Sequence, residues 1–291
     1  MIPFAKGHGL GNDYLVMEEK DLTASLSTEA IVRICDRNWG VGSDGILLLV
    51  PTGKADFGLR IFNPDGSEAE KSGNGLRIFA KYLWDTGHAR NERFTVDTKG
   101  GVVECLCHVR DGRMGFVTVE MGHATFRTRE IPMTGTHDDA VAVPLALDDG
   151  TTLTVTAVSV GNPHCIVFTE RLDEAEVRRL GPKIENHRAF PNRTNVQFAR
   201  RLGDDAIEIM IWERGAGWTL ASGSSSCGAA SAAVRNGYCR HGRVAVRMPG
   251  GELAIEVRPD WSLRLEGAVE LVCTGTLTKD FFDAYVRPGR G

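Results

Sequence analysis

The 291-residue chain lacks several features that would assign it to a specialised class of protein. No apolar run approaches the roughly 20 residues that a membrane-spanning helix needs. No group of Cys and His residues has the spacing of a zinc site, so we expect no metal ion. The first residues do not show the charged-then-apolar pattern of a secretory signal, and we therefore expect a cytoplasmic protein. Low-complexity segments are missing as well.

Charge and cysteine usage narrow the class further. The net charge is −4 at pH 7, which argues against nucleic acid or an anionic membrane as the partner. The seven cysteines are odd in number and scattered, so we expect reduced packing residues and no disulfide framework. Cys105 and Cys107 lie in strand-like sequence, where their spacing places both side chains on one face.

Strand patterns outnumber helix patterns along the chain. Hydrophobic runs and turn residues predict strands over 44–51, 56–63, 101–109, 114–121, 152–160, 164–168, 193–212 and 242–267, the last two ranges holding more than one strand each. Asp111-Gly112 predicts a hairpin turn between two of them. Helical spacing predicts helices over 28–38, with Thr28 as a candidate cap, and over 73–87, 174–181 and 227–237.

The order of these elements predicts an α+β fold of two similar halves, each with strands around one helix. A polar loop after a strand precedes both the helix at 73–87 and the helix at 227–237. We expect an N-terminal half of residues 1–122 plus 277–291 and a C-terminal half of residues 123–276. The segment 279–286 is expected to return to the first half.

Two Ser-Gly steps, Ser72-Gly73 and Ser222-Gly223, open the two central helices. A helix N-terminus carries unpaired N–H groups and partial positive charge, and glycine lets a ligand approach the backbone closely. Both steps are therefore candidate anion sites, and facing each other they could hold one carboxylate. The alternative is that each serine only caps its helix.

Polar loops near these steps add amides, carboxylates and a guanidinium. The residues are Asn12, Asn63, Asn162, His164, Asn195, Glu213 and Arg214. Asn next to Gly or Pro commonly forms turns, and an Arg beside a Glu is commonly a surface pair. As a set, however, they suit a small zwitterion, since amides and a guanidinium bind carboxylate and a carboxylate binds ammonium.

The motifs KGHGLGNDY, GVGSDG, FNPDGSEAE, GNPHC, RTNVQF and ERGAG resemble those of the diaminopimelate epimerase family along almost the whole chain. The resemblance implies two pseudo-symmetric halves, each a barrel-like, mostly antiparallel sheet around a central helix, with the active site in the cleft between them. It also implies cofactor-independent proton exchange at the α-carbon of an amino acid, through two cysteines on opposite faces. Family members are commonly homodimers, which we carry over as an expectation.

The resemblance also assigns roles to residues of this chain. It places Asn63, Asn162, Asn195, Glu213 and Arg214 at the distal amino acid end of the substrate, and Asn12 at a further substrate contact. Backbone donors to the reacting carboxylate match Gly73, Asn74, Gly223 and Ser224, and His164 matches a residue beside one catalytic position. The two catalytic positions themselves are Ser72 and Ser222, where the family has cysteine.

Serine ionises far less readily than cysteine and needs an adjacent base, so three alternatives follow. The chain is an engineered double Cys→Ser form, a natural serine branch with related chemistry such as dehydration of a hydroxy amino acid, or an amino acid binder without activity. His8, His164 and Glu213 are candidate substitute bases, whereas Cys227 is expected in the core. We expect an amino acid epimerase, most simply one acting on diaminopimelate in lysine and cell-wall precursor synthesis.

Overall fold

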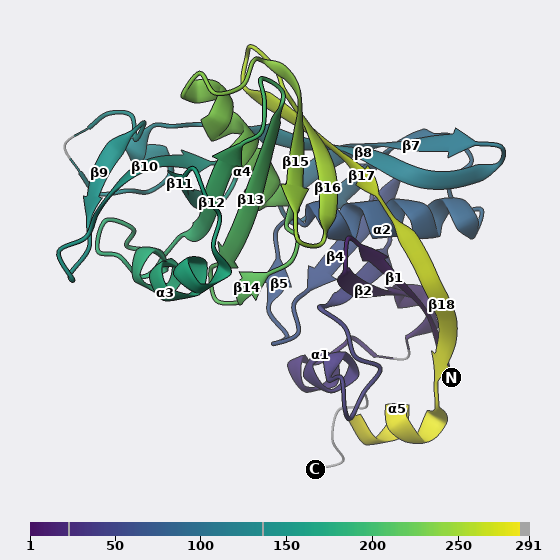
Figure 1. Ribbon diagram of the computed structural model, residues 1–291. Helices are drawn as coiled ribbons and strands as arrows, with labels where there is room; N and C mark the ends of the chain where they lie inside the picture. The colour runs from purple at the N-terminus through teal and green to yellow at the C-terminus, as the bar shows by residue number, and fades with distance from the viewer. Residues whose placement is uncertain (23, 136, 286–291) are drawn as a thin grey trace. The chain divides into compact units, whose positions relative to one another are not determined.

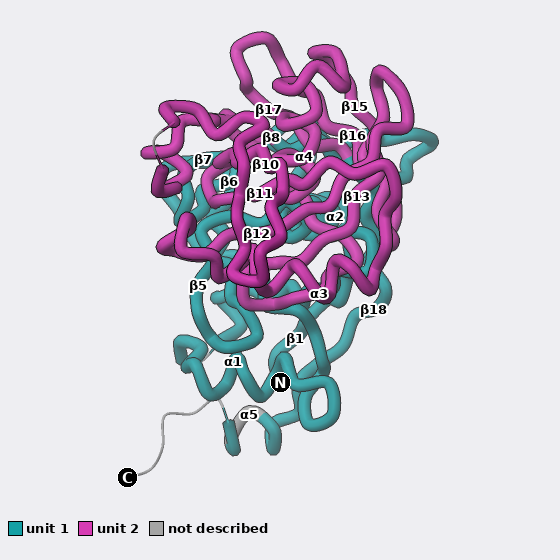
Figure 2. Tube along the Cα trace, turned by 60° about the vertical axis from the view of Figure 1, so that its left-hand side comes forward, with its two compact units in different colours: residues 1–119, 267–291 teal, residues 120–266 magenta. Residues whose placement is uncertain are grey.

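A computed structural model describes residues 1–22, 24–135 and 137–285 (Figure 1). The chain divides into two compact units, Met1–Val119 with Gly267–Gly291, and Glu120–Glu266 (Figure 2). The expected halves place residues 120–122 with the first half and residues 267–276 with the second, whereas the units place 120–122 with the second and 267–276 with the first. Residues 267–276 carry most of one strand. They belong to the first unit because strand β18 (Glu270–Leu277) pairs with strand β1 (Ile2–Gly9) along its length.

The described residues of the first unit form one mixed sheet and three α-helices. Its other strands are β2 (Asn12–Glu18), β3 (Ile46–Val50), β4 (Phe57–Phe62), β5 (Glu68–Ala69), β6 (Arg93–Thr98), β7 (Gly101–Arg110) and β8 (Arg113–His123). The pairing order is β18-β1-β2-β3-β4-β6-β7-β8, with β5 added to β4. Only β2–β3 and β4–β6 are parallel among these pairs. Helix α1 (Thr28–Cys35) follows β2, α2 (Gly73–Asp85) follows β5, and α5 (Lys279–Tyr285) follows β18.

The second unit repeats this arrangement strand for strand. Its strands are β9 (Val143–Ala146), β10 (Thr152–Ser159), β11 (Pro163–Phe168), β12 (Asn195–Arg201), β13 (Ala206–Glu213), β14 (Gly217–Thr219), β15 (Gly242–Met248), β16 (Gly251–Val257) and β17 (Ser262–Ala268). The order is β9-β10-β11-β12-β13-β15-β16-β17, with β14 added to β13 and β11–β12 and β13–β15 parallel. Helix α3 (Glu174–Glu185) follows β11, and α4 (Gly223–Arg235) follows β14. The expected α+β fold of two pseudo-symmetric, mostly antiparallel halves is confirmed.

Each unit keeps one helix in its core. Helix α2 packs on β1, β2, β7 and β18, and helix α4 packs on β10, β11, β12, β13, β15 and β16. Nearly every residue of α4 from Ser225 to Val234 is buried, and α2 is buried from Gly73 to Ala80. The strands therefore place the N-terminal turn of each central helix inside a shell of polar loops.

Local features mostly follow the sequence patterns. Gly87 ends α2 with φ of 74°, a left-handed conformation that favours glycine. Cys105 and Cys107 are both fully buried on one face of β7, and burial raises the pKa of both thiols. All seven cysteines are free. No helix among the described residues is long and apolar enough to cross a bilayer.

Several expected element boundaries were wrong. Helix α1 is capped by Ser27, whose hydroxyl accepts from the amide of Ala30, so Thr28 is the first helical residue and not the cap. Helix α3 continues past the expected range 174–181 to Glu185 and contains Pro182, because the burial of Leu180 and Ile184 outweighs one missing hydrogen bond. Helix α4 includes four residues before the Ala-rich range 227–237 and begins at Gly223, as the Ser222-Gly223 step predicts. The strands β5 and β14 have only two and three residues, too few for a sequence pattern to detect, and β9 was not expected although its four residues alternate between buried and exposed.

The C-terminal segment returns to the first unit as expected. Helix α5 contacts α1, and Arg33 Nη2 donates to Tyr285 Oη at 3.2 Å (Figure 1). Residue 286, the last of the expected segment, lies outside the described residues.

Candidate active site

Ser72 caps α2 through its side chain. Its backbone is extended, with φ −141° and ψ 117°, and its Oγ accepts a hydrogen bond from the amide of Gly75 at 3.0 Å. The hydroxyl of Tyr14 lies 3.5 Å from the same oxygen. The amides of Gly73 and Asn74 belong to the first turn, where a helix has no partner for its N–H groups. This turn can therefore bind an anion beside the Ser72 hydroxyl.

A chain of side-chain hydrogen bonds links this turn to the start of β2 and to Asp44. Asn74 is buried, and its Nδ2 donates to Asn12 Oδ1 at 3.0 Å. Asn12 Nδ2 in turn donates to Asp44 Oδ2 at 2.8 Å. The structure thus brings together two predicted site residues, Asn12 and Asn74, and fixes the direction of each amide.

Asp44 belongs to a charged cluster that anchors the start of β2. Arg37 Nη2 bridges Asp13 and Asp44 at 2.7 Å each, and Lys6 Nζ lies 2.9 Å from Asp13. Burial opposes ionisation of Asp13, but the bonds from Arg37 and Lys6 outweigh it and lower its pKa. The loop that presents Asn12 is consequently held by an ionised carboxylate at neutral pH.

Ser222 caps α4 in the same way. Its φ of −148° and ψ of 128° match those of Ser72, and its Oγ accepts from the amide of Ser225 at 3.4 Å. The next turn is rich in hydroxyls: Ser226 Oγ donates to the carbonyl of Ser222 at 2.8 Å, and Gln197 Nε2 donates to Ser225 Oγ at 3.0 Å. Gly223 and Ser224 supply the first-turn amides.

His164 lies under α4 as a fully buried imidazole. Its Nε2 is 2.9 Å from Asn162 Oδ1, and a Cβ atom on Gly228 would lie 3.1 Å from its Cγ. Burial lowers the pKa of His164 to about 3, against a smaller opposing effect of Gln197. The ring is therefore neutral at physiological pH, and it would be a weak general base because its conjugate acid is too strong.

The loop at the carboxyl end of β13 is tied to the start of β12. Asn195 Nδ2 donates to the carbonyl of Pro163 at 2.9 Å, and its Oδ1 accepts from the backbone amide of Arg214 at 3.0 Å. The Arg214 side chain donates to the carbonyl of Asn192 at 3.2 Å and is exposed. Asn195 and Arg214 are thus brought together, with the guanidinium facing solvent.

Other predicted residues lie in their own turns. Asn63 Nδ2 donates to Ser67 Oγ at 2.9 Å in the turn after β4, and Glu213 Oε2 accepts from Thr219 Oγ1 at 3.2 Å. His8, on β1, has Nε2 3.7 Å from Glu270 Oε2. Among the described residues, no imidazole or carboxylate hydrogen bonds to the hydroxyl of Ser72 or Ser222. Within the first unit His8 is not hydrogen bonded to Ser72, and within the second unit neither His164 nor Glu213 is hydrogen bonded to Ser222.

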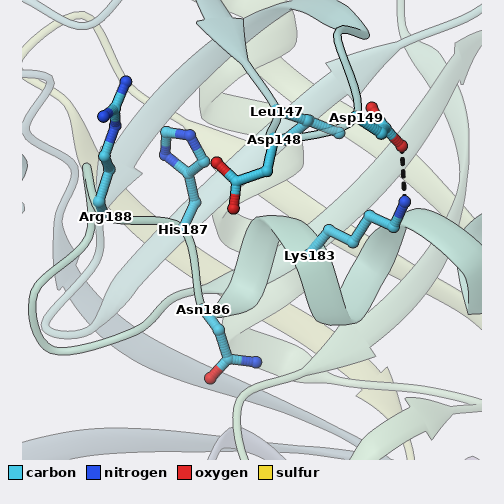
Figure 3. A pocket seen from close by; sticks show the side chains of 7 residues that line it. All are labelled: Leu147, Asp148, Asp149, Lys183, Asn186, His187 and Arg188. Atoms are coloured by element: carbon cyan, nitrogen blue, oxygen red, sulfur yellow. Dashed lines mark hydrogen bonds and ion pairs between the residues drawn. The ribbon is translucent and has the colours of Figure 1, made fainter.

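A hollow of about 550 Å³ lies elsewhere on the second unit (Figure 3). It is lined by Leu147, Asp148, Asp149, Lys183, Asn186, His187 and Arg188, and none of these is a predicted site residue. Lys183 Nζ lies 2.5 Å from Asp149 and, with Thr151, holds the pKa of that carboxyl below its usual range. Its charges are already paired or solvated, so the hollow shows no convergent set of groups for a substrate.

Sequence reasoning missed the side chains that hold the site residues. Gln197 lies inside the motif RTNVQF, and a polar residue in a run of buried strand residues was the available signal. Arg77 lies in the motif SGNGLR and is fully buried. Both make their contacts within one helix turn of a capping serine.

Comparison with known proteins agrees with the motifs. The family model described as diaminopimelate epimerase matches residues 4–127 and 156–272. A protein named diaminopimelate epimerase 2 from Nostoc sp. is 47% identical over 281 residues, 96% of each chain. A diaminopimelate epimerase from Pelotomaculum thermopropionicum is 42% identical over 274 residues, 94% of this chain and 97% of that one.

Solved structures show the same fold at low identity. A hydroxyproline epimerase from Agrobacterium vitis has a TM-score of 0.69 at 14% identity and covers 96% of this chain and 93% of that one. A phenazine biosynthesis protein of the PhzF family from Bacillus anthracis has a TM-score of 0.68 at 17% identity, over 95% and 99% of the two chains. From the family model and the curated relatives together, the chain belongs to the diaminopimelate epimerase family and is an isomerase.

Proposed function

We propose that the protein is a cofactor-independent amino acid isomerase that binds diaminopimelate, with Ser72 and Ser222 in its two proton-transfer positions. The observation that carries the proposal is the pair of serine-capped helix starts. They occupy equivalent places in a repeated unit and have the same backbone geometry. Each places a side-chain oxygen beside amides that can bind a carboxylate.

The proposed reaction is an inversion at the α-carbon. The amides of Gly73, Asn74, Gly223 and Ser224 would bind the α-carboxylate and stabilise the charge that develops on it. The Cα–H bond breaks, its electron pair passes into the carboxylate system, and the proton goes to the group at one serine position. The group at the other position returns a proton to the opposite face, so the stereocentre inverts.

The polar loops suit the distal end of the substrate. Asn63, Asn162, Asn195, Glu213 and Arg214 would bind the second amino acid group, and Asn12 would support the site through Asn74. Support for this comes from the fixed amides of Asn12 and Asn195 and from the exposed guanidinium of Arg214. A zwitterion needs such a mixture of donors and carboxylate.

Serine in both proton-transfer positions predicts a low rate of exchange at the α-carbon. A hydroxyl is a much weaker acid than a thiol, and neither serine contacts a strong base among the described residues. The exchange rate should therefore be low in this protein and should rise when thiols are introduced. His164 beneath α4 does not compensate, because burial keeps its pKa at about 3.

Location and assembly complete the proposal. We place the protein in the cytoplasm, which is supported by seven free cysteines, since disulfides are rare there. We propose a small amino acid as the only ligand and a homodimer as the assembly, on the strength of the family. Size-exclusion chromatography with light scattering would test the assembly.

The decisive experiment follows the α-proton of LL-diaminopimelate by NMR in heavy water. The unchanged protein should exchange it slowly, and Ser72→Cys with Ser222→Cys should raise the rate by about 10²- to 10⁴-fold and produce the meso isomer. The control is Ser72→Ala with Ser222→Ala, which keeps the pocket and should lose exchange.

A thermal-shift titration with the same compound separates the possible failures. Stabilisation without exchange in the thiol variant would mean a binder without epimerase chemistry. If the thiol variant shows no exchange and no stabilisation, diaminopimelate is excluded as the substrate. Release of water from a β-hydroxy amino acid, with no exchange on diaminopimelate, would identify a dehydratase.

A further inference from the structure

One buried position just past the first turn carries side chains of different charge in the two central helices. Counted from the capping serine, Arg77 in α2 corresponds to Cys227 in α4, and both side chains have no exposed surface. A fully buried arginine is rare unless its donors are satisfied. The two halves therefore place groups of different charge beneath otherwise matching helix starts.

The contacts of Arg77 fix its guanidinium under the first turn of α2. Nη1 donates to the carbonyl of Gly73 at 3.2 Å, and Nη2 donates to Asn74 Oδ1 at 2.8 Å. Nε donates to the carbonyl of Ala268 at 3.4 Å. A Cβ atom on Gly9 would lie only 2.6 Å from Nη2, so β1 also closes over the group. The guanidinium cannot move away without losing these hydrogen bonds in a buried position.

A fixed cation here adds to the positive end of the helix. The N-terminus of α2 already carries partial positive charge next to Ser72. In an interior of low effective dielectric constant, a nearby unit charge acts far more strongly than in water. An anion at the Ser72 position is therefore favoured by the helix and by Arg77 together.

The first turn of α4 is surrounded by neutral groups instead. The hydroxyls of Ser225 and Ser226, the amide of Gln197 and the imidazole of His164 are all buried. The ring carries no charge at neutral pH because burial lowers the pKa of His164 to about 3. Arg214 is exposed, so solvent weakens its charge, which still adds to burial in lowering the pKa of His164.

Other titratable or charged groups lie on the elements packed against the two helices. On β1, β2, β7 and β18, packed on α2, they are Lys6, His8, Asp13, Tyr14, Glu18, Glu104, Cys105, Cys107, His108, Arg110, Glu270 and Cys273. On β11, β12, β13, β15 and β16, packed on α4, they are His164, Cys165, Arg200, Arg201, Glu208, Glu213, Arg243, Arg247, Glu252 and Glu256. The difference in pKa between a thiol at position 72 and a thiol at position 222 reports the net effect of all these groups.

We propose that Arg77 is a positioning residue that makes the Ser72 position the base and leaves the Ser222 position the acid before substrate binds. This rests on the proposed two-position proton transfer. The group at position 72 then takes the proton from the α-carbon, and the group at position 222 gives its own proton to the opposite face. The resting protein is thus set for one stereoisomer of the substrate.

The test needs no substrate, so its outcome is independent of whether diaminopimelate is the right ligand. Ser72→Cys and Ser222→Cys are made separately, and the rate of alkylation by iodoacetamide is measured from pH 5 to 10. Peptide mass spectrometry separates the new thiol from Cys273, the exposed native cysteine. The thiol at position 72 should titrate about one pH unit or more below the thiol at position 222. Equal or reversed values would overturn the proposal.

Variants of Arg77 assign the difference to this residue. In the Ser72→Cys protein, Arg77→Met should raise the apparent pKa of the new thiol by about one pH unit or more, and Arg77→Lys by less. In the Ser222→Cys protein, neither should move it. The matched control is Arg60→Met, which removes an arginine paired with Glu68 on the surface of the same unit.

A purely structural role would give a different pattern. It would lower the melting temperature of Arg77→Met without moving the pH dependence of the thiol at position 72, and that result would overturn the proposal. If Arg77→Met does not fold, Arg77→Lys and the comparison of the two thiols beside an unchanged Arg77 still decide between the alternatives.

Discussion

The two halves of the molecule share a pairing order and a helix cap but fill their central helices differently. Helix α2 carries the large buried side chains Leu76, Phe79 and Leu83, whereas α4 is built from the small residues Gly, Ala, Ser and Cys over the same turns. Both solutions satisfy the same strand topology. The sheet and the caps therefore determine the fold, while the helix interior is free to set the chemistry of each half.

Small residues on α4 let polar strand residues come close. A Cβ atom on Gly228 would lie 3.1 Å from Cγ of His164, so a larger side chain there would require the ring to shift, and Gln197 reaches Ser225 from β12. On α2 the corresponding volume is occupied by bulky apolar groups and by the Arg77 guanidinium. One half thus has a hydroxyl-rich, neutral helix start, and the other has a cationic one.

The largest expected effect is a loss of stability that tests the packing difference between α2 and α4. Phe79→Ala should lower the free energy of unfolding by about 3–5 kcal/mol, because it removes a fully buried ring and leaves a cavity. The corresponding residue of α4 is already alanine, and Ala229→Gly should cost only about 1 kcal/mol through helix propensity. Urea unfolding at pH 7 measures both. Similar losses in the two helices would contradict the packing difference.

The repeat itself could be predicted from sequence because it depends on local signals. Strand alternation, the Ser-Gly steps and Gly87 all act over a few residues. The difference in charge between the starts of α2 and α4 could not be predicted from sequence. Arg77 resembles any arginine on a helix surface until its burial is known. The same holds for Gln197, whose partner Ser225 lies in a distant segment.

Boundaries failed where tertiary packing outweighs local preference. The helix expected over 174–181 continues through Pro182 to Glu185, because Ile184 packs in the core of the second unit. Among site residues, Asn12 with Asn74 and Asn195 with Arg214 were expected on the strength of motifs and are found in contact. The substitute bases His8, His164 and Glu213 were expected from side-chain chemistry alone, and within its own unit none of them is hydrogen bonded to the capping serine.

A smaller effect that distinguishes the two halves is the pH dependence of the unfolding free energy. His164 and Tyr14 are the last residues of the matching motifs GNPH and GNDY, but only the imidazole titrates in the acid range. In the unfolded chain a histidine takes up a proton near pH 6.5, whereas burial holds the pKa of folded His164 at about 3. As the pH falls through this window, the unfolded state is favoured and stability is lost, by up to about 1.4 kcal/mol per pH unit.

Replacing the ring tests this sign. His164→Gln should flatten the decline of the unfolding free energy between pH 6.5 and 4, measured by urea titration, relative to the parent. Tyr14→Phe is the matched control in the first half and should leave the slope unchanged. An identical slope in His164→Gln and the parent would show that the folded imidazole takes up its proton as readily as the unfolded one.

The smallest effect concerns the feature that the halves share most closely. Ser72→Ala and Ser222→Ala should each cost about 1 kcal/mol, because each removes the acceptor for one first-turn amide. The loss should be somewhat larger at Ser72, whose oxygen is 3.0 Å from the Gly75 amide, than at Ser222, at 3.4 Å from the Ser225 amide. Urea unfolding of the two variants decides this. Comparable costs would mean that capping is common to both halves and that their difference begins only with the side chains beneath the first turn, whereas no cost at either position would mean that the serines are kept for proton transfer alone.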